Sequence, residues 1–377
     1  MRNLATVAPG CKPITGAASA QEEGRVILNS KVPSERRICL SSFAPGCKMI
    51  CRSDRAEQRE EDMKLINKLA AGFIAAGIAF GAAGGALAQD LNIIAVTHGQ
   101  ASDPFWSVVK NGMTQGAKDM GVNLDYRAPE TFDMVAMSQL IDAAVNQNPA
   151  GIVISNPDPD ALGPSIQRAV AAGIPVISLN SGIAAAEGLG IRLHVGQDEL
   201  PAGVKVGEKL AGLGLKHVLC VNQEVGNAAL DQRCAGVTEG FKDGTVTVLP
   251  TTADPAEIEA KIQAALTSDS SIDVVLGLSA PLVGERAVDV VQKMGAAEKV
   301  KVASYDLSSN FLQAVVDGKA LFAVDQQPFL QGALPVIFLA QYARYGTMPA
   351  GNIASGPSFV TQENAAQVIA LSGQGIR

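Results

Sequence analysis

Polar and aromatic side chains recur just beyond the strand-like runs of this chain. Carboxylate, amide and guanidinium groups have fixed hydrogen-bond geometry and pair with hydroxyl groups, which both donate and accept. Aromatic rings can cover the C–H faces between such hydroxyls. Each residue alone could be an ordinary helix cap or turn residue, but the whole set predicts a site for a neutral, polyhydroxylated ligand. The residues of this predicted site are Asp103, Phe105, Trp106, Asn180, Gln197, Glu224, Asn227, Arg233, Ser279, Asp306 and Gln326.

The sequence signatures of catalysis and of metal binding are missing from the chain. It has neither a G-x-x-x-x-G-K-[ST] phosphate loop nor a G-x-S-x-G nucleophile elbow. The first strand is followed by HGQASDPFW rather than by a G-x-G-x-x-G dinucleotide motif. His98, His194 and His217 lack metal-ligand spacing, and we interpret each as a loop or core histidine. The sequence therefore predicts a protein that is not an enzyme and that carries no metal and no cofactor.

Short β-branched runs alternate with amphipathic helical patterns, which is typical of parallel-sheet α/β units. In the first half, the predicted strands are residues 91–97, 122–127, 151–155 and 174–179, and the predicted helices are 104–120, 133–147 and 160–172. In the second half, the predicted strands are 218–221, 245–249, 274–278, 300–304 and 321–325, and the predicted helices are 227–241, 256–268, 282–294, 311–317 and 329–345. The predicted fold class is α/β, with two doubly wound parallel-sheet lobes joined by a three-segment hinge.

The two lobes should meet at the carboxyl ends of their strands, where open α/β sheets bind ligands. We expect the chain to cross between them near Gln197, Gln326 and Pro357. The predicted N-terminal lobe comprises residues 89–197 and 327–357, and the predicted C-terminal lobe comprises residues 198–326 and 358–377.

Residues 63–88 have the pattern of a bacterial secretory signal peptide. Lys64 and Lys68 form a basic start, residues 69–87 form an apolar run, and an A-x-A cleavage motif ends at Ala88. The abundant Gly and Ala and the small-residue cleavage site favour this interpretation over a transmembrane anchor. We therefore predict export to the periplasm, with cleavage after Ala88.

Residues 1–62 precede this predicted signal and hold ten basic residues, eight acidic residues and four of the six cysteines. Their charge run at residues 52–62 cannot bury enough apolar surface to fold alone. Because an export signal does not normally follow such a leader, we interpret residues 1–62 as a non-native gene-start artefact. A real, disordered extension is the alternative.

Composition also narrows the class of partner. Residues 89–377 hold 18 basic and 29 acidic residues, a formal charge of −11, which argues against nucleic acid and anionic membrane surfaces as partners. The two remaining cysteines, Cys220 and Cys234, are candidates for a disulfide, which in a loop of this length contributes about 3 kcal/mol. A pair of buried free thiols is the alternative.

Several stretches within residues 91–369 resemble the type I periplasmic solute-binding proteins of ABC sugar importers, specifically the ribose-binding-like branch. They are, in the family's order, DPFWSVVKNGMTQGAKDMG, AGIVISNPDPDALGPSIQRAVAAGIPVISLNSG, LHVGQDELPAGVKVGEKL, RCAGVTEGF, VASYDLSSNFLQAV and FAVDQQPFLQG. The resemblance implies a monomeric carrier that clamps a sugar between its lobes and docks on an inner-membrane permease. A LacI-type sugar-responsive transcriptional regulator and a receptor that presents its ligand for chemotaxis or sensing are the alternatives.

The resemblance also implies roles for particular residues. Phe105 and Trp106 match the family's stacking pair, and Asp103 lies where the family uses a polar residue just ahead of them. Arg233 matches a hydroxyl-binding arginine. The remaining two matches are a carboxylate at Asp306 and a glutamine near the hinge at Gln326.

Two departures from the family pattern bear on the ligand. Asn180-Ser181 replaces a charged pair that ribose- and galactose-type members carry, and Ser279-Ala280 replaces an Asn-Asp pair. These changes remove strong partners of ring hydroxyls, although Glu224 could take over part of that role. We therefore expect a related sugar or a sugar alcohol rather than ribose.

Overall fold

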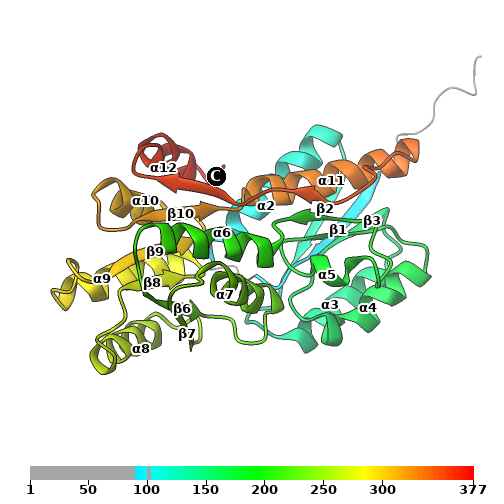
Figure 1. Ribbon diagram of the computed structural model, residues 1–377. Coiled ribbons are helices and arrows are strands. Elements are labelled where there is room, and N and C mark those ends of the chain that lie inside the picture. The colour runs from blue at the N-terminus through cyan, green and yellow to red at the C-terminus, as the bar shows by residue number, and fades with distance from the viewer. Residues whose placement is uncertain (1–89, 100–102) are drawn as a thin grey trace, which may run out of the picture. The chain divides into compact units, whose positions relative to one another are not determined.

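The computed structural model describes residues 90–99 and 103–377, so the predicted leader and signal peptide lie outside the described residues. Within this part, the strands form two sheets (Figure 1). The first sheet has the strand order β11-β5-β4-β3-β1-β2, and all its neighbouring strands are parallel. Its strands are β1 (Asn92–Val96), β2 (Asn123–Arg127), β3 (Gly151–Ser155), β4 (Val176–Leu179), β5 (Leu193–Gly196) and β11 (Ile353–Ala354).

The second sheet repeats this order as β12-β10-β9-β8-β6-β7. Its strands are parallel except β12, which pairs antiparallel with β10. They are β6 (His217–Asn222), β7 (Thr245–Pro250), β8 (Val274–Gly277), β9 (Lys301–Tyr305), β10 (Phe322–Asp325) and β12 (Ser358–Thr361). The predicted α/β fold class of two doubly wound sheets is confirmed.

Alternate side chains of β1 pack into two different hydrophobic cores, which shows that helices cover both faces of the first sheet. Ile93 and Ala95 belong to the core under α2 and α11, whereas Ile94 and Val96 belong to the core under α3 and α4. Successive side chains of a strand point to opposite faces, so an apolar run of this kind is buried on both sides. We call this sheet and its helices the first lobe. The helices are α2 (Pro104–Met120), α3 (Met134–Val145), α4 (Pro159–Ala171), α5 (Ile183–Ala186) and α11 (Pro328–Tyr345).

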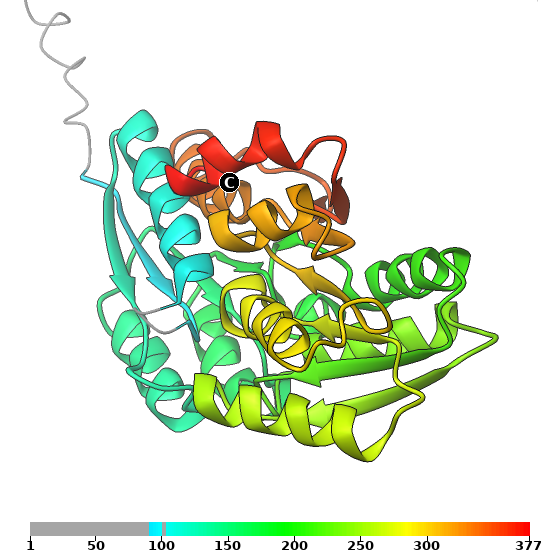
Figure 2. The ribbon, with the colours of Figure 1, turned by 90° about the vertical axis from the view of Figure 1, so that its left-hand side faces the viewer.

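The second sheet and its helices, which we call the second lobe, follow the same plan. Helices α6 and α7 cover one face, and α8, α9, α10 and α12 cover the other (Figure 2). Helices α6 and α7 approach so closely that a Cβ atom added at Gly203 would lie 2.4 Å from the carbonyl oxygen of Arg233. The helices are α6 (Glu199–Gly212), α7 (Ala228–Gly240), α8 (Pro255–Ser268), α9 (Glu285–Lys293), α10 (Ser309–Val316) and α12 (Ala365–Gly373).

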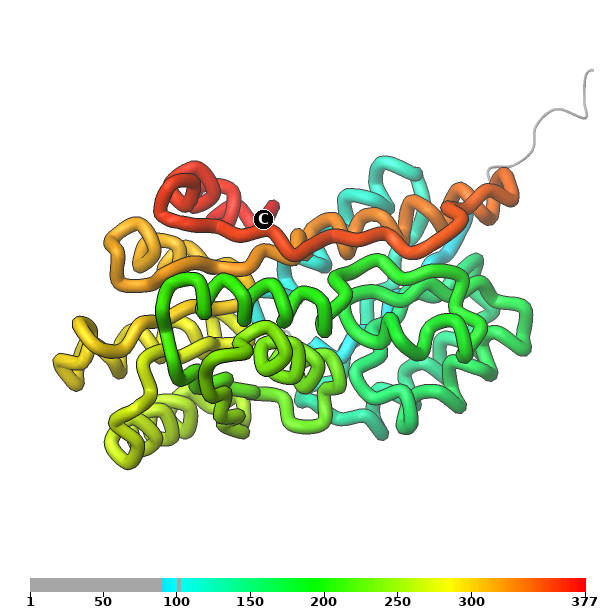
Figure 3. Tube along the Cα trace, viewed as in Figure 1, coloured from blue at the N-terminus to red at the C-terminus, as the bar shows by residue number. Residues whose placement is uncertain are grey.

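The chain passes three times between the two sheets, as the trace in Figure 3 shows. The passages lie between β5 and α6, between β10 and α11, and between β11 and β12. The assignment of these three passages as a hinge, and of the lobe boundaries at Gln197, Gln326 and Pro357, stays a prediction. No helix of the described ranges is both long and apolar enough to cross a membrane.

Several elements differ from the sequence prediction. The predicted helix 282–294 is a π-helical turn, Ala280–Gly284, followed by α9. Strands β5, β11 and β12 were not predicted, because strands of two to four residues are too short to show a period. Helices α5, α6 and α12 were not predicted either.

Candidate functional site

The carboxyl ends of strands from both sheets enclose a small cavity of about 30 Å³. Ten of the eleven residues predicted from the sequence line it, and Gln197 does not. The structure thus brings the predicted set together, while its role in ligand binding stays a prediction. The lining residues are His98, Asp103, Phe105, Trp106 and Asn180 from the first lobe, with Gln223, Glu224, Asn227, Leu230, Arg233, Leu278, Ser279, Asp306 and Gln326 from the second lobe and the passage after β10.

Aromatic rings form the first-lobe wall of the cavity. Asp103 precedes α2 and accepts a hydrogen bond from the backbone N–H of Phe105 at 2.9 Å, so it fixes where the helix starts. The rings of Phe105 and Trp106 meet edge to face with centroids 5.3 Å apart, and Trp106 meets His98 in the same way at 4.7 Å. A Cβ atom at Gly99 would lie 1.8 Å from the Trp106 ring, so the ring needs glycine at that position.

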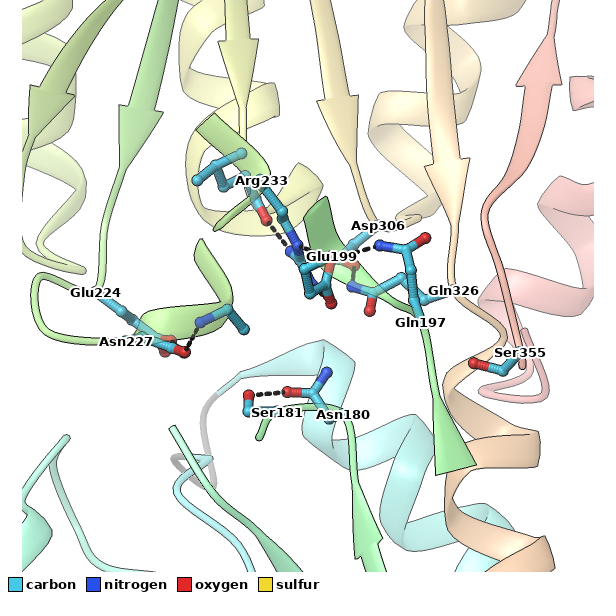
Figure 4. A network of polar contacts seen from close by, with 12 residues as sticks. Asn180, Ser181, Gln197, Glu199, Glu224, Asn227, Arg233, Asp306, Gln326 and Ser355 are labelled. Carbon is cyan, nitrogen blue, oxygen red and sulfur yellow. Dashed lines mark hydrogen bonds and ion pairs between the residues drawn. The ribbon is translucent and has the colours of Figure 1, made fainter. Parts of the chain in front are cut away.

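A buried ion pair supports the second-lobe wall (Figure 4). Arg233 donates from Nε and Nη2 to the two carboxylate oxygens of Glu199, at 2.7 and 2.8 Å, and from Nη1 to the Leu278 carbonyl at 3.2 Å. Burial opposes the charge on Arg233, but the pair with Glu199 outweighs it and holds the Arg233 pKa above its ordinary value. Gln197 donates to the same Glu199 carboxylate at 2.6 Å. Gln197 therefore acts on the cavity indirectly, through Glu199 and Arg233.

Glu199 was not among the residues predicted from the sequence. It occupies the first turn of α6, a helix that the pattern did not reveal, and its carboxylate is 1% exposed. The available signal was Arg233 itself, because a buried arginine needs a carboxylate partner.

Asn180 and Asp306 occupy corresponding places at the ends of β4 and β9. Both have left-handed backbone, with φ of 61° and 67°, a conformation that few residues other than glycine adopt. Asn180 accepts from the Ser181 hydroxyl at 2.8 Å, and Asp306 accepts from the Gln326 amide at 2.5 Å. Burial raises the Asp306 pKa to about 7, although Arg233 and Gln326 oppose the rise.

Acidic groups outnumber cationic ones around the cavity. Burial raises the pKa of Asp103 to about 7, the carboxylates of Glu224 and Asp306 add to the rise, and the Phe105 N–H opposes it. Burial also raises the pKa of Glu224. Because Glu199 already neutralises Arg233, the cavity favours a ligand that offers many hydrogen-bond donors.

The loop after β6 carries Glu224 and reaches the first lobe. Asn227 donates to the Glu224 carboxylate at 2.7 Å, which holds that side chain in place. The Glu224 carboxylate lies 3.8 Å from Nε2 of His98. Ala228, the first residue of α7, donates its backbone N–H to the Pro157 carbonyl of the first lobe at 3.0 Å. The two lobes are thus in direct contact beside the cavity.

A disulfide between Cys220 and Cys234 joins β6 to α7, with Cα atoms 6.0 Å apart. The closed segment contains Glu224, Asn227 and Arg233. Because a cross-link reduces the freedom of everything between its ends, the disulfide restrains three of the cavity residues at once.

Three buried polar atoms at the cavity make no hydrogen bond to any described residue. They are Oε1 of Gln223, Oγ of Ser279 and Oε1 of Gln326. Buried polar groups are normally paired, so unpaired atoms that line a cavity point to a polar ligand.

The three histidines lie in different surroundings. His194 bonds Ser178 inside the first lobe and His217 bonds Ser271 and Thr247, as expected of core or loop histidines. His98, in contrast, lines the cavity. Among the described residues, no cluster of three or more His, Cys, Asp or Glu side chains is arranged to hold a metal ion.

Comparison with known proteins agrees with this geometry. Residues 94–347 match the family model described as periplasmic binding protein domain. The chain is 25% identical over 291 residues to the xylose/arabinose-binding protein of Sulfolobus acidocaldarius, a match that covers 72% of this chain and 71% of that protein.

Two solved structures are similar over nearly their whole length. A carbohydrate transporter from Acidothermus cellulolyticus 11B, crystallised in complex with myo-inositol, is 36% identical, with a TM-score of 0.72 over 76% of this chain and 99% of that one. An ABC sugar transporter (periplasmic sugar binding protein) from Legionella pneumophila is 26% identical, with a TM-score of 0.65 over 70% and 99%. With the two-sheet fold and the cavity between the sheets, these matches show that the chain belongs to the periplasmic binding protein family.

Proposed function

We propose that this protein is the periplasmic substrate-binding component of an ABC transporter. It captures a monosaccharide or a sugar alcohol between its lobes and delivers it to a permease in the inner membrane. It acts as a monomer after export and cleavage of the signal peptide following Ala88.

One observation carries this proposal: a cavity between the lobes combines an aromatic wall with buried, hydrogen-bonding side chains on the opposite side. A polyol has C–H faces that pack on rings and hydroxyl groups that pair with carboxylates and amides. Phe105 and Trp106 offer the first kind of contact, and Asp306 and Arg233 offer the second.

The names of the similar proteins support the same class of ligand. They include a xylose/arabinose-binding protein and a carbohydrate transporter that holds myo-inositol. The excess of carboxylates fits such ligands, because each hydroxyl can donate one hydrogen bond to an acidic oxygen.

The size of the cavity supports a cycle of opening and closing. A space of about 30 Å³ has room for about two water molecules, so a polyol needs the lobes to move apart. The contact between Ala228 and Pro157 would break in that step and form again on closure. A ligand that contacts both lobes favours the closed form by its differential affinity for it.

A thermal-shift screen of residues 89–377 tests the proposal. The panel contains myo-inositol, D-xylose, D-ribose and xylitol, each at millimolar concentration. A ligand with micromolar affinity raises the free energy of unfolding by about 4 kcal/mol, and the Asp306→Asn variant should shift less. If no member of the panel stabilises the protein, the proposed ligand class is wrong.

A further inference from the structure

We propose that His98 binds the ligand: its Nε2–H donates to a ligand hydroxyl, which in turn donates to Glu224 across the cleft. This inference rests on the proposed function and deepens it, since it assigns a donor and a two-lobe subsite to the same cavity. His98 lies two residues beyond the end of β1, lines the cavity and is 2% exposed.

Packing holds the His98 ring in one orientation. Trp106 meets it edge to face at 4.7 Å between centroids, and Phe132 meets it at 5.8 Å and 90°. A side chain fixed by two aromatic neighbours loses little rotamer freedom when it binds a ligand.

Hydrogen bonds to Ser155 decide which ring nitrogen of His98 carries the proton. The Ser155 hydroxyl oxygen accepts the backbone N–H of His98 at 2.9 Å and lies 2.7 Å from Nδ1. Ser155 is fully buried, and among the described residues its hydroxyl proton has no acceptor other than Nδ1. The hydroxyl therefore donates to Nδ1, and the neutral ring keeps its proton on Nε2.

Burial keeps the ring neutral. It lowers the pKa of His98 to about 3, and the positive charge of Arg233 adds to the effect. His98 thus presents one N–H donor to the cavity without adding a charge.

His98 adds a neutral donor to a cavity lined by carboxylates and unpaired amide oxygens. Arg233 already donates three of its N–H groups to Glu199 and Leu278. A hydroxyl oxygen of the ligand has lone pairs that need a donor, and leaving them unpaired in a buried site weakens binding.

The position of Glu224 completes a subsite for one hydroxyl group. Glu224 lies two residues beyond β6, the strand that corresponds to β1, and its carboxylate is 3.8 Å from His98 Nε2. That distance is too long for a direct hydrogen bond, and a hydroxyl oxygen placed beside the pair can bond both groups. A hydroxyl that accepts from His98 and donates to Glu224 ties the first lobe to the second.

A pair of substitutions separates ligand binding from a structural role of His98. In His98→Gln the amide nitrogen can replace Nε2 and keep the donor to the cavity, while the bond to Ser155 is lost. In His98→Asn the amide can replace Nδ1 and keep the bond to Ser155, while the donor to the cavity is lost. His217→Asn is the control, because His217 lies at the start of β6, the end away from the cavity.

Each protein is titrated calorimetrically with the member of the four-compound panel that the wild type binds most tightly. We expect His98→Asn to bind at least tenfold more weakly than the wild type, His98→Gln to bind more tightly than His98→Asn, and His217→Asn to stay within about threefold of the wild type. If His98→Asn binds like the wild type, or His98→Gln is weakened as much as His98→Asn, the inference is wrong. If the wild type itself binds no compound of the panel, the proposed function fails first and the inference falls with it.

A second measurement uses the wild-type protein and therefore does not depend on the folding of a variant. The chain has only three histidines, so long-range ¹H–¹⁵N NMR spectra of the imidazole rings are simple to assign. We expect His98 to show a protonated Nε2 whose signal shifts when the bound panel compound is added. A protonated Nδ1, or no shift on binding, would overturn the assignment.

Discussion

The two lobes share one backbone plan and differ in what their strand ends carry. Asn180 after β4 and Asp306 after β9 hold the same place in the two sheets and the same left-handed backbone, yet one is an amide and the other a carboxylate. The first lobe adds the Phe105 and Trp106 rings, and the second adds the charged group Arg233. The shared backbone thus sets the position of each strand-end residue, and the residue type decides what that residue can bind.

The different side chains of the two lobes suit different parts of a ligand. The first lobe presents mainly an aromatic surface, which suits a C–H face, and the second presents most of the ionised groups, which suit hydroxyls. Neither lobe alone encloses a polyol, so the complete site exists only when both lobes meet.

The largest expected effect concerns the ion pair under the second-lobe wall. Replacement of Glu199 by alanine leaves Arg233 buried and unpaired, which should lower the free energy of unfolding by about 3–5 kcal/mol. Urea unfolding measures the change. Asp198→Ala is the matched control, because its exposed side chain makes no capping hydrogen bond. Equal stability of the two variants would show that the second lobe does not depend on this pair.

Removal of the disulfide has the second-largest expected effect on stability. Replacement of both Cys220 and Cys234 by serine should lower the free energy of unfolding by about 3 kcal/mol, because the unfolded chain regains the freedom of the closed loop. Ligand affinity should fall as well, since the segment carries Glu224, Asn227 and Arg233. Reduction of the wild type should reproduce both changes, and an unchanged unfolding midpoint after complete reduction would contradict the expectation.

Exchange of the corresponding strand-end residues tests the lobe comparison itself. Asp306→Asn should weaken polyol binding by about 1.5–3 kcal/mol, or roughly ten- to a hundredfold, because a charge-assisted hydrogen bond becomes a neutral one. Asn180→Asp should also weaken binding, since it adds a carboxylate to a cavity already rich in them. Calorimetry measures both, and wild-type affinity in Asp306→Asn would remove the functional difference between the lobes.

The smallest expected effect is a pH dependence of binding. Asp103 and Asp306 have pKa values of about 7, so below pH 7 each mostly holds a proton that a donating ligand hydroxyl must displace. Affinity should therefore rise from pH 6 to pH 8, by about tenfold for each group that ionises on binding. Titrations in buffers of different ionisation enthalpy count the protons released. Affinity that is constant or falls over this range would contradict the expected direction.

The sequence predicts most of the site because parallel strands place their carboxyl ends at one edge of a sheet. Asn180 and Asp306 were found in this way, whereas Arg233 on α7 was found by its place two helical turns beyond Asn227 and by the resemblance to the family. That resemblance is confirmed by the match over residues 94–347. Glu199 was missed because it depends on the close packing of α6 against α7. The place of His98 in the cavity wall could not be predicted, because a lone histidine has no spacing signal; only its contacts with Trp106 and Ser155 reveal its orientation.

A crystal structure of residues 89–377 with the bound panel compound is the sharpest test of a site shared by the two lobes. We expect one polyol molecule in the cavity, stacked on Trp106 and hydrogen-bonded to Asp306, so that both lobes contact it. A compound bound outside this cavity, or held by one lobe alone, would show that the proposed site is wrong.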